Sequence, residues 1–184
     1  AADDADDGGD DGGDDVGGAC DGGECWRAPD GWVPGDSSRV WAREGFPTVV
    51  LLDEMLPGGE LPGLYAAVDA FVLPSRGEGW GRPVAEAMAM GVPVIATNWS
   101  GTTAFLDDEV GYPLPYTLQP APHAAGQMWA DPNVSALREL MRRVVDDPED
   151  ARARAAAARA RIVSRYSQAA VADLLVDRLV ALEP

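Results

Sequence analysis

The stretch PSRGEGWGRPVAEAMAMGVPVIAT, residues 74–97, decides the fold, because a glycine-rich turn within it leads straight into a helix. Before the turn, residues 70–73 (AFVL) form a continuous apolar run, as expected of a parallel strand that is buried on both faces. Pro83 suits the first helical position, and apolar residues then recur at helical spacing. Gly91 ends this helix, and residues 92–96 predict the next buried strand. The unit is therefore strand, tight loop, helix and strand.

The glycine-rich turn, residues 75–82, lies at the carboxyl end of the first strand, where open α/β sheets bind their ligands. Its glycines leave backbone amides uncovered, and the free N–H groups of the following helix add partial positive charge, so a phosphate suits this place. Glu86 stands about one turn into the helix and leans back toward its N-terminus. Because an ionised carboxylate only accepts hydrogen bonds, it matches vicinal hydroxyls, and the combination indicates a sugar or a ribose attached to phosphate.

Each of these features also has a simpler interpretation. A glycine-rich turn between strand and helix can serve packing geometry alone. Glu86 can complement the helix dipole, and Glu78 can be a solvated carboxylate of the loop. The flanking residues 86–97 (EAMAMGVPVIAT) favour the functional interpretation over these three.

The pair Glu78 and Glu86, with seven residues between them, resembles the signature of the retaining glycosyltransferases of family 4. These enzymes have the GT-B fold of two facing Rossmann-like domains. The resemblance is close over residues 49–114 and looser from Trp129 onward. It implies an α/β fold with a Rossmann-like parallel sheet, the C-terminal donor-binding domain of a GT-B enzyme, followed by a helical C-terminal tail.

The resemblance also implies a role for each residue of the signature. Glu86 would bind the ribose hydroxyls of a nucleotide-sugar donor, and Glu78, the catalytic candidate, would lie beside the transferred sugar. The backbone amides expected to face the sugar or its diphosphate are those of Gly79, Trp80 and Gly81. Arg82 is a further candidate for donor binding, although Arg76 and Arg82 are equally compatible with ordinary surface positions. Family members need no obligatory metal, so neither a metal nor a cofactor is expected.

Parts of a complete enzyme are not recognisable in the sequence. A GT-B enzyme has an N-terminal acceptor domain and a basic pair for the diphosphate, whereas this chain has no lysine and no matching segment before Phe46. We therefore expect a fragment of a glycosyltransferase that transfers a sugar with retention to an unidentified acceptor. One alternative is a catalytically silent remnant that binds a nucleotide-sugar. An unrelated Rossmann enzyme is disfavoured, since no GxGxxG motif opens a first strand.

Composition divides the chain into four parts. Residues 1–24 are rich in Asp and Gly and are expected to be disordered, because they cannot bury enough apolar surface. Residues 25–46 form a Trp-rich segment without a clear element, residues 47–128 the α/β core, and residues 129–184 the C-terminal helices. The formal net charge of −17 argues against binding to nucleic acid or to anionic membranes.

Other chemistry finds little support in the sequence. Cys20 and Cys25 lack a second pair or a histidine cluster, so they predict neither a zinc site nor a disulfide framework. His123 lies in a loop-like segment with no partner for general-base work. No segment is apolar enough to span a membrane, and we expect a soluble chain, in the cytoplasm rather than secreted.

Three helices are expected in the C-terminal part. Asn133 or Ser135 caps the first, which runs to about residue 145 with an apolar stripe. Pro148 opens the second, which runs to about Tyr166, and Ser167 caps an amphipathic third. The arginines of the second helix resemble a stripe that binds nucleic acid. The neighbouring carboxylates argue against this function.

Overall fold

The computed structural model describes residues 33–34, 40–42, 44–52, 56–57, 59–122 and 124–182. The chain divides into two compact units, Ala1–Leu56 and Pro57–Pro184. The acidic leader, Cys20, Cys25 and His123 lie outside the described residues, so the expectations for them stay untested.

The first unit contains a small antiparallel sheet with the strand order β1-β2-β3. Its strands are β1 (Val33–Pro34), β2 (Val40–Ala42) and β3 (Val49–Val50), and Trp41 pairs with both Pro34 and Val49. Two of these strands lie in the stretch for which the sequence predicts no regular element. Strands of two or three residues are too short to show the alternation by which a strand is recognised in a sequence.

The second unit is built on a parallel sheet with the order β4-β5-β6, as the sequence predicts. Its strands are β4 (Phe71–Leu73), β5 (Val94–Thr97) and β6 (Tyr112–Leu114). All four residues of the central strand β5 are buried. The expectation that the first strand is buried on both faces is met in part: Phe71 and Leu73 pack on one face and Val72 on the other, but all three are half-buried, as is usual for a strand at the edge of the described sheet.

Helix α2 (Arg82–Ala89) follows β4 and packs on one face of the sheet. It begins after Gly81, whose φ of 94° is left-handed, carries Pro83 in its first turn, and is followed by Gly91 with φ 73°. Its buried residues pack with alternate residues of β5 and with α4 (Pro148–Tyr166). The shorter helix α1 (Leu61–Ala66) precedes β4 and packs beside α2 through Tyr65.

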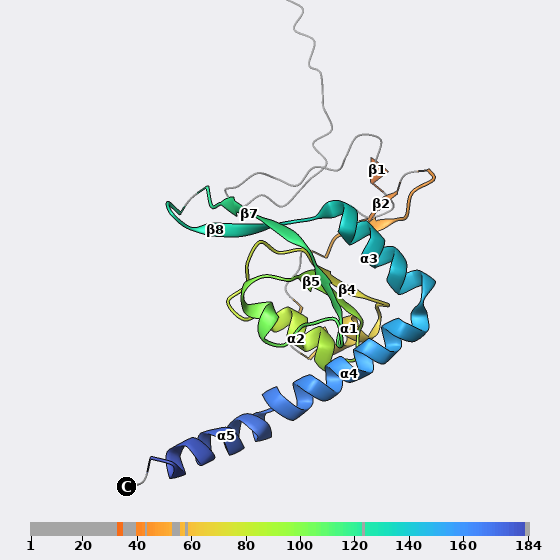
Figure 1. Cartoon of the computed structure of the whole chain (residues 1–184). Helices are drawn as coiled ribbons and strands as arrows, with labels where there is room; N and C mark the ends of the chain where they lie inside the picture. Colours follow the sequence, from red (N-terminus) through yellow and green to blue (C-terminus); the bar gives the residue numbers. More distant parts are fainter. Residues whose placement is uncertain are drawn as a thin grey trace, which may run out of the picture. The chain divides into compact units, whose positions relative to one another are not determined.

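Helix α3 (Val134–Asp146) covers the opposite face, where Ile95 of β5 packs with Leu137, Leu140 and Val144 (Figure 1). Asn133 rather than Ser135 caps this helix, and its side chain accepts a 3.0 Å hydrogen bond from the amide of Ala136. The sheet is therefore covered on both faces, as in other open α/β folds.

The helix start expected at Pro148 and the cap expected at Ser167 are also found. Asp147 caps α4, whose first turn contains Pro148, and the Ser167 hydroxyl accepts from the amide of Ala170 at the start of α5 (Gln168–Val180). No residue of α5 is buried in the described part of the chain. Its exposed apolar residues are Val171, Leu174, Leu175, Val176, Leu179 and Val180.

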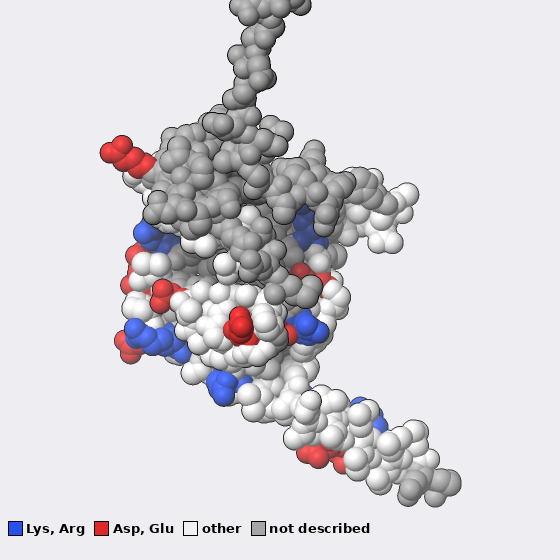
Figure 2. Space-filling view, turned by 180° about the vertical axis from the view of Figure 1, so that it is seen from behind, with Lys and Arg blue, Asp and Glu red and all other residues white. Residues whose placement is uncertain are grey.

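Three of the arginines of α4, Arg154, Arg159 and Arg161, bind acceptors within the domain. Asp150 accepts hydrogen bonds from Arg154 at 2.9 Å, Arg143 at 3.1 Å and the Tyr112 hydroxyl at 3.0 Å. Arg161 pairs with Asp107 at 2.5 Å. On the face shown in Figure 2, basic and acidic side chains lie interspersed. These pairings agree with the argument from composition that the arginines do not form a basic stripe for nucleic acid.

Two elements before and after β6 were not predicted. A short 3-10 helix, η1 (Ser100–Ala104), follows β5, and an antiparallel hairpin of β7 (Tyr116–Pro120) and β8 (Met128–Pro132) follows β6 (Figure 1). In the hairpin, Leu118 pairs with Ala130, the one fully buried residue of β8. Both elements contact the glycine-rich loop between β4 and α2, so they bear directly on the candidate site.

Candidate donor-binding site

The glycine-rich loop connects the carboxyl end of β4 to the first turn of α2, as predicted. Among the residues that the structure describes, the amides of Gly79, Trp80 and Gly81 have no hydrogen-bond partner. The first turn of α2 adds the partial positive charge of a helix N-terminus. Unpaired amides at a helix N-terminus are suited to bind an anion.

The backbone of the loop is held from η1. The Ser100 hydroxyl and the Gly101 amide both donate hydrogen bonds to the main-chain oxygen of Glu78, at 2.8 Å and 3.0 Å. Gly101 lies so close that a Cβ atom on it would be 2.5 Å from the Gly79 oxygen and from the Trp80 Cα. Only glycine permits this approach, so η1 fixes the shape of the loop.

Thr102 of η1 supports the end of the same loop. Its buried hydroxyl donates to the main-chain oxygen of Thr97 at 2.9 Å, which ties η1 to the end of β5. Its methyl group would be 2.7 Å from a Cβ placed on Gly81. Gly81 therefore needs to be glycine for two reasons, its left-handed φ and this contact.

The side chain of Trp80 packs against two aromatic rings. The indole packs against Phe105 at 4.9 Å and Tyr166 at 5.3 Å between ring centroids, and the Tyr166 hydroxyl donates to the Ala104 oxygen at 3.2 Å. The side chain thus joins the loop to η1 and α4. The residue as a whole remains 38% exposed, and its amide has no partner among the described residues.

Glu78 and Glu86 occupy different surroundings. The main chain of Glu78 is fixed by η1, while its half-buried carboxylate has no ion-pair or hydrogen-bond partner in the described part of the chain. The carboxylate of Glu86 is bound on both oxygens: Tyr65 donates to Oε2 at 3.1 Å, and Arg82 pairs with Oε1 at 3.0 Å. The Glu86 side chain is 34% exposed, so it remains accessible to a ligand.

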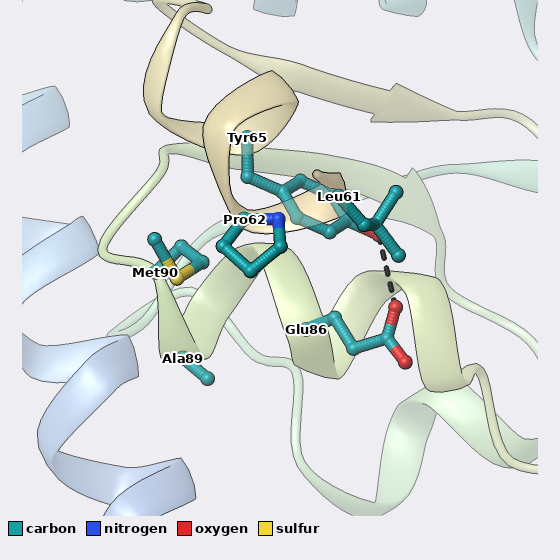
Figure 3. Close-up of a pocket in the computed structure, with 6 residues that line it drawn as sticks. All are labelled: Leu61, Pro62, Tyr65, Glu86, Ala89 and Met90. Carbon is teal, nitrogen blue, oxygen red and sulfur yellow. Dashed lines mark hydrogen bonds between the residues drawn. The ribbon is translucent and has the colours of Figure 1, made fainter. Parts of the chain in front are cut away.

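A pocket of about 290 Å³ lies beside Glu86, between α1 and α2 (Figure 3). The residues that line it are Leu61, Pro62, Tyr65, Glu86, Ala89 and Met90. The Glu86 carboxylate is the one charged group in an otherwise mostly apolar lining. A few polar groups in an apolar concavity are typical of small-molecule sites.

Tyr65 is a site residue that sequence reasoning missed. Its ring is buried and lies edge-on to Phe71, with 5.8 Å between the ring centroids. Burial, together with the hydrogen bond to Glu86 and the negative charge of that residue, raises the pKa of Tyr65 to about 12. One tyrosine in a six-residue helix carries no sequence pattern that would have identified it.

The two arginines of the loop differ in how free they are. The Arg82 side chain is 83% exposed and has Glu86 as its ion-pair partner. Arg76 is engaged by the β7–β8 hairpin: its guanidinium lies 4.7 Å from the Trp129 ring centroid and 3.7 Å from Asp131, and its main-chain oxygen accepts from Ala130. Arg82 is thus the more exposed of the two, while the Arg76 side chain is 56% exposed.

Comparison with known proteins places this chain in a family. Residues 32–147, more than half of the chain, match the sequence profile of Glycosyl transferases group 1. The chain belongs to this family. The matched range includes the whole β4–α2 loop, η1 and the pocket residues, and the α/β architecture with a parallel sheet and C-terminal helices is that expected of a group 1 domain of the GT-B type.

Several curated glycosyltransferases are similar to parts of the chain. The 2-deoxystreptamine glucosyltransferase of Streptomyces kanamyceticus is 33% identical over 65% of this chain and 27% of its own length. The GDP-mannose-dependent alpha-mannosyltransferase of Mycolicibacterium smegmatis is 43% identical over 38% of this chain and 18% of its own. O-antigen chain mannosyltransferase B of Escherichia coli is 54% identical over 23% and 11%. The chain thus spans at most about a quarter of these relatives.

A solved structure, the sucrose-phosphate synthase of Thermosynechococcus elongatus, is 29% identical, with a TM-score of 0.48 over 65% of this chain and 27% of that one. In the described part of this chain, no helix has both the length and the apolar character needed to cross a membrane.

Proposed function

We propose that this group 1 glycosyltransferase chain binds a nucleotide-sugar donor and takes part in transferring its sugar, with retention of configuration, to an acceptor. The observation that carries the proposal is the position of Glu86. Its carboxylate lies on α2 at the edge of a pocket, and three amides of the loop that begins this helix have no partner among the residues that the structure describes. If hydroxyl groups of a ligand bind to Glu86, a phosphate attached to that ligand would lie within reach of the loop.

Each part of the donor has a matching group in this proposal. The ribose hydroxyls donate to Glu86, because a carboxylate accepts two such bonds with good geometry. The diphosphate binds the amides of Gly79, Trp80 and Gly81 and the N-terminus of α2. Arg82, which is exposed, turns from Glu86 to the diphosphate. In this scheme the amides, the helix and Arg82 offset the phosphate charge, so no metal is required.

Glu78 is proposed to lie beside the transferred sugar. Retention in this scheme follows from attack on the face from which the leaving group departs, through an ion-pair-like transition state. The unpaired carboxylate of Glu78 would position the sugar and stabilise the positive charge that develops on it. It is not proposed as a covalent nucleophile. The acceptor is proposed to be held by a facing N-terminal domain of the GT-B type.

A second candidate is a chain that binds a nucleotide-sugar without catalysing transfer. The contacts of Arg76 with the hairpin favour it, since Asp131 and Trp129 compete with the diphosphate for one of the two loop arginines. Weak charge compensation would slow departure of the diphosphate while still allowing binding.

Calorimetry and a release assay separate these candidates. The named relatives use mannosyl and glucosyl donors, so UDP-glucose and GDP-mannose are the first to test, each beside its free nucleotide. Binding together with acceptor-dependent release of UDP or GDP supports the transferase. Binding without release, also after addition of an acceptor domain from a homologue, supports the silent binder. No binding of either donor contradicts both.

A further inference from the structure

Tyr65 contacts Glu86, the carboxylate that is proposed to bind the nucleotide-sugar. The mechanism above does not use this contact. The Tyr65 hydroxyl lies 3.1 Å from Glu86 Oε2 (Figure 3). The same hydroxyl lies 3.4 Å from the main-chain oxygen of Pro83. We propose that Tyr65 is a positioning residue for the donor, which holds Glu86 Oε2 so that Oε1 faces the incoming hydroxyls. This inference rests on the proposed function, because it assigns the role of Tyr65 through Glu86.

The two partners of Glu86 differ in how firmly they are held. Tyr65 is 8% exposed, and its ring is fixed between α1, α2 and Phe71 of β4. Arg82 is 83% exposed and sits one helical turn before Glu86. An exposed ion pair of this kind contributes little and is readily exchanged. The hydroxyl of Tyr65 is therefore held at Oε2, whereas a ligand can replace Arg82 at Oε1.

A carboxylate has about four lone-pair positions, so a single hydroxyl donor leaves room for a ligand. The bond from Tyr65 fixes the orientation of the carboxylate before a ligand binds. Without this bond, the flexible Glu86 side chain would lose conformational entropy upon binding. The raised pKa of Tyr65 keeps its phenol protonated, and thus a donor, throughout the physiological range. Binding would then exchange Arg82 for the hydroxyls on Oε1, and free Arg82 for the phosphates.

The chain contains a matched control for this contact. Tyr112 also donates to a carboxylate, that of Asp150 at 3.0 Å, is 1% exposed, and likewise has its pKa raised to about 12 by burial and its acidic partner. It packs with α3 on the opposite face of the sheet from α2. Tyr112→Phe therefore removes the same type of bond with no part in the donor site.

The test measures binding of UDP and GDP to the full 184-residue chain by calorimetry. For Tyr65→Phe we expect binding about 3- to 10-fold weaker, the effect of having to order one flexible carboxylate side chain upon binding. Tyr112→Phe should bind as the wild type does, although both variants should melt at a lower temperature. On a Glu86→Ala background, Tyr65→Phe should cause no further loss, because the carboxylate through which it acts is gone.

The outcomes are distinct. If the wild type binds UDP or GDP and Tyr65→Phe binds equally well, Tyr65 has no positioning role, while the proposed function stands. An equal loss with and without Glu86, or an equal loss in Tyr112→Phe, would show a general structural effect and also overturn the inference. If the wild type binds neither nucleotide, the proposed function fails, and the role of Tyr65 fails with it.

Discussion

The hydroxyl of Ser100 donates a 2.8 Å hydrogen bond to the main-chain oxygen of Glu78. Ser100 has a φ of 65°, a left-handed conformation that is uncommon for a residue other than glycine. Backbone strain of this kind costs about 1 to 3 kcal/mol and persists where the surrounding structure enforces it, often at functional sites. Here the strained residue fixes the backbone of Glu78 from outside the loop and leaves the carboxylate free.

Two substitutions of Ser100 should separate the bond from the strain. Ser100→Ala loses the hydroxyl and keeps the strain, so we expect a loss of about 1 kcal/mol in the free energy of unfolding. Ser100→Gly loses the same bond but removes the strain, so its stability should equal or exceed that of Ser100→Ala. Urea unfolding measures both. If Ser100→Gly were the less stable variant, strain at this position would be refuted.

Gly101→Ala should disturb the loop more severely. The new Cβ would lie 2.5 to 2.6 Å from backbone atoms of Gly79 and Trp80, so the loop or η1 must move. We expect a loss of about 1 to 3 kcal/mol in stability, as for other overpacked sites, and loss of nucleotide binding. Gly63→Ala is the control, because a Cβ there meets nothing within 4 Å, and it should leave the melting temperature unchanged or higher. Equal behaviour of the two variants would contradict the close packing.

The β4–α2–β5 unit could be predicted because its signals are local in the sequence. An apolar run precedes a glycine-rich turn, Pro83 opens the helix and Gly91 closes it, and each signal acts within a few residues of its own position. The caps at Asn133 and Ser167 were predictable for the same reason. In each case the residue type alone favours the conformation that it adopts.

The supports of the loop could not be predicted, because their partners are distant in the sequence. Ser100 contacts Glu78 across 22 positions and Tyr65 contacts Glu86 across 21, and no local pattern specifies either pairing. The β7–β8 hairpin was missed because β7 is mostly exposed and ends in Pro120, so it lacks the alternation of a half-buried strand. Local signals thus fix the elements, while the contacts that shape the site depend on how they pack.

Stability should fall in alkaline solution through Tyr65 and Tyr112. The pKa of each is raised by burial from 10 to about 12, so between these values the folded chain keeps protons that the unfolded chain has released. Stability that is present below pH 10 is therefore lost as the pH rises toward 12. At about 1.36 kcal/mol per pKa unit, each tyrosine accounts for up to about 2.7 kcal/mol. Urea midpoints measured from pH 9 to pH 11 should fall less steeply in the double Phe variant than in the wild type.

Stability should also fall in acid through Asp150. Burial opposes ionisation of this residue, but hydrogen bonds from Arg154 and Tyr112 and the charges of Arg154 and Arg143 lower its pKa below 3.8. The ionised form of Asp150 stabilises the folded chain above pH 3.8. This contribution to stability is lost as the pH falls through the lowered pKa. Asp150→Asn should reduce this acid dependence, as urea midpoints between pH 5 and pH 3 would show. An unchanged dependence would place the acid sensitivity elsewhere.

The two glutamates of the loop and helix should respond differently to substitution. Glu86→Ala removes the acceptor proposed for the ribose, so binding of a nucleotide-sugar should weaken by about 1.5 to 3 kcal/mol, the range for a lost charge-assisted hydrogen bond. Glu78→Gln keeps the size of the side chain and removes the charge proposed to act on the sugar, so binding of free UDP or GDP should be nearly unchanged. Sugar transfer, where it is detected, should be lost in both.

This asymmetry distinguishes the proposed roles from a general effect of removing a carboxylate. Calorimetry with UDP and GDP on the two variants measures it directly, and Glu139→Gln is a suitable control, since Glu139 is an exposed residue of α3, on the opposite face of the sheet from α2. The control should bind as the wild type does. If Glu78→Gln and Glu86→Ala lost equal affinity for the free nucleotide, the separate assignment of the ribose to Glu86 and the transferred sugar to Glu78 would be wrong, because a free nucleotide lacks the transferred sugar that Glu78 would contact.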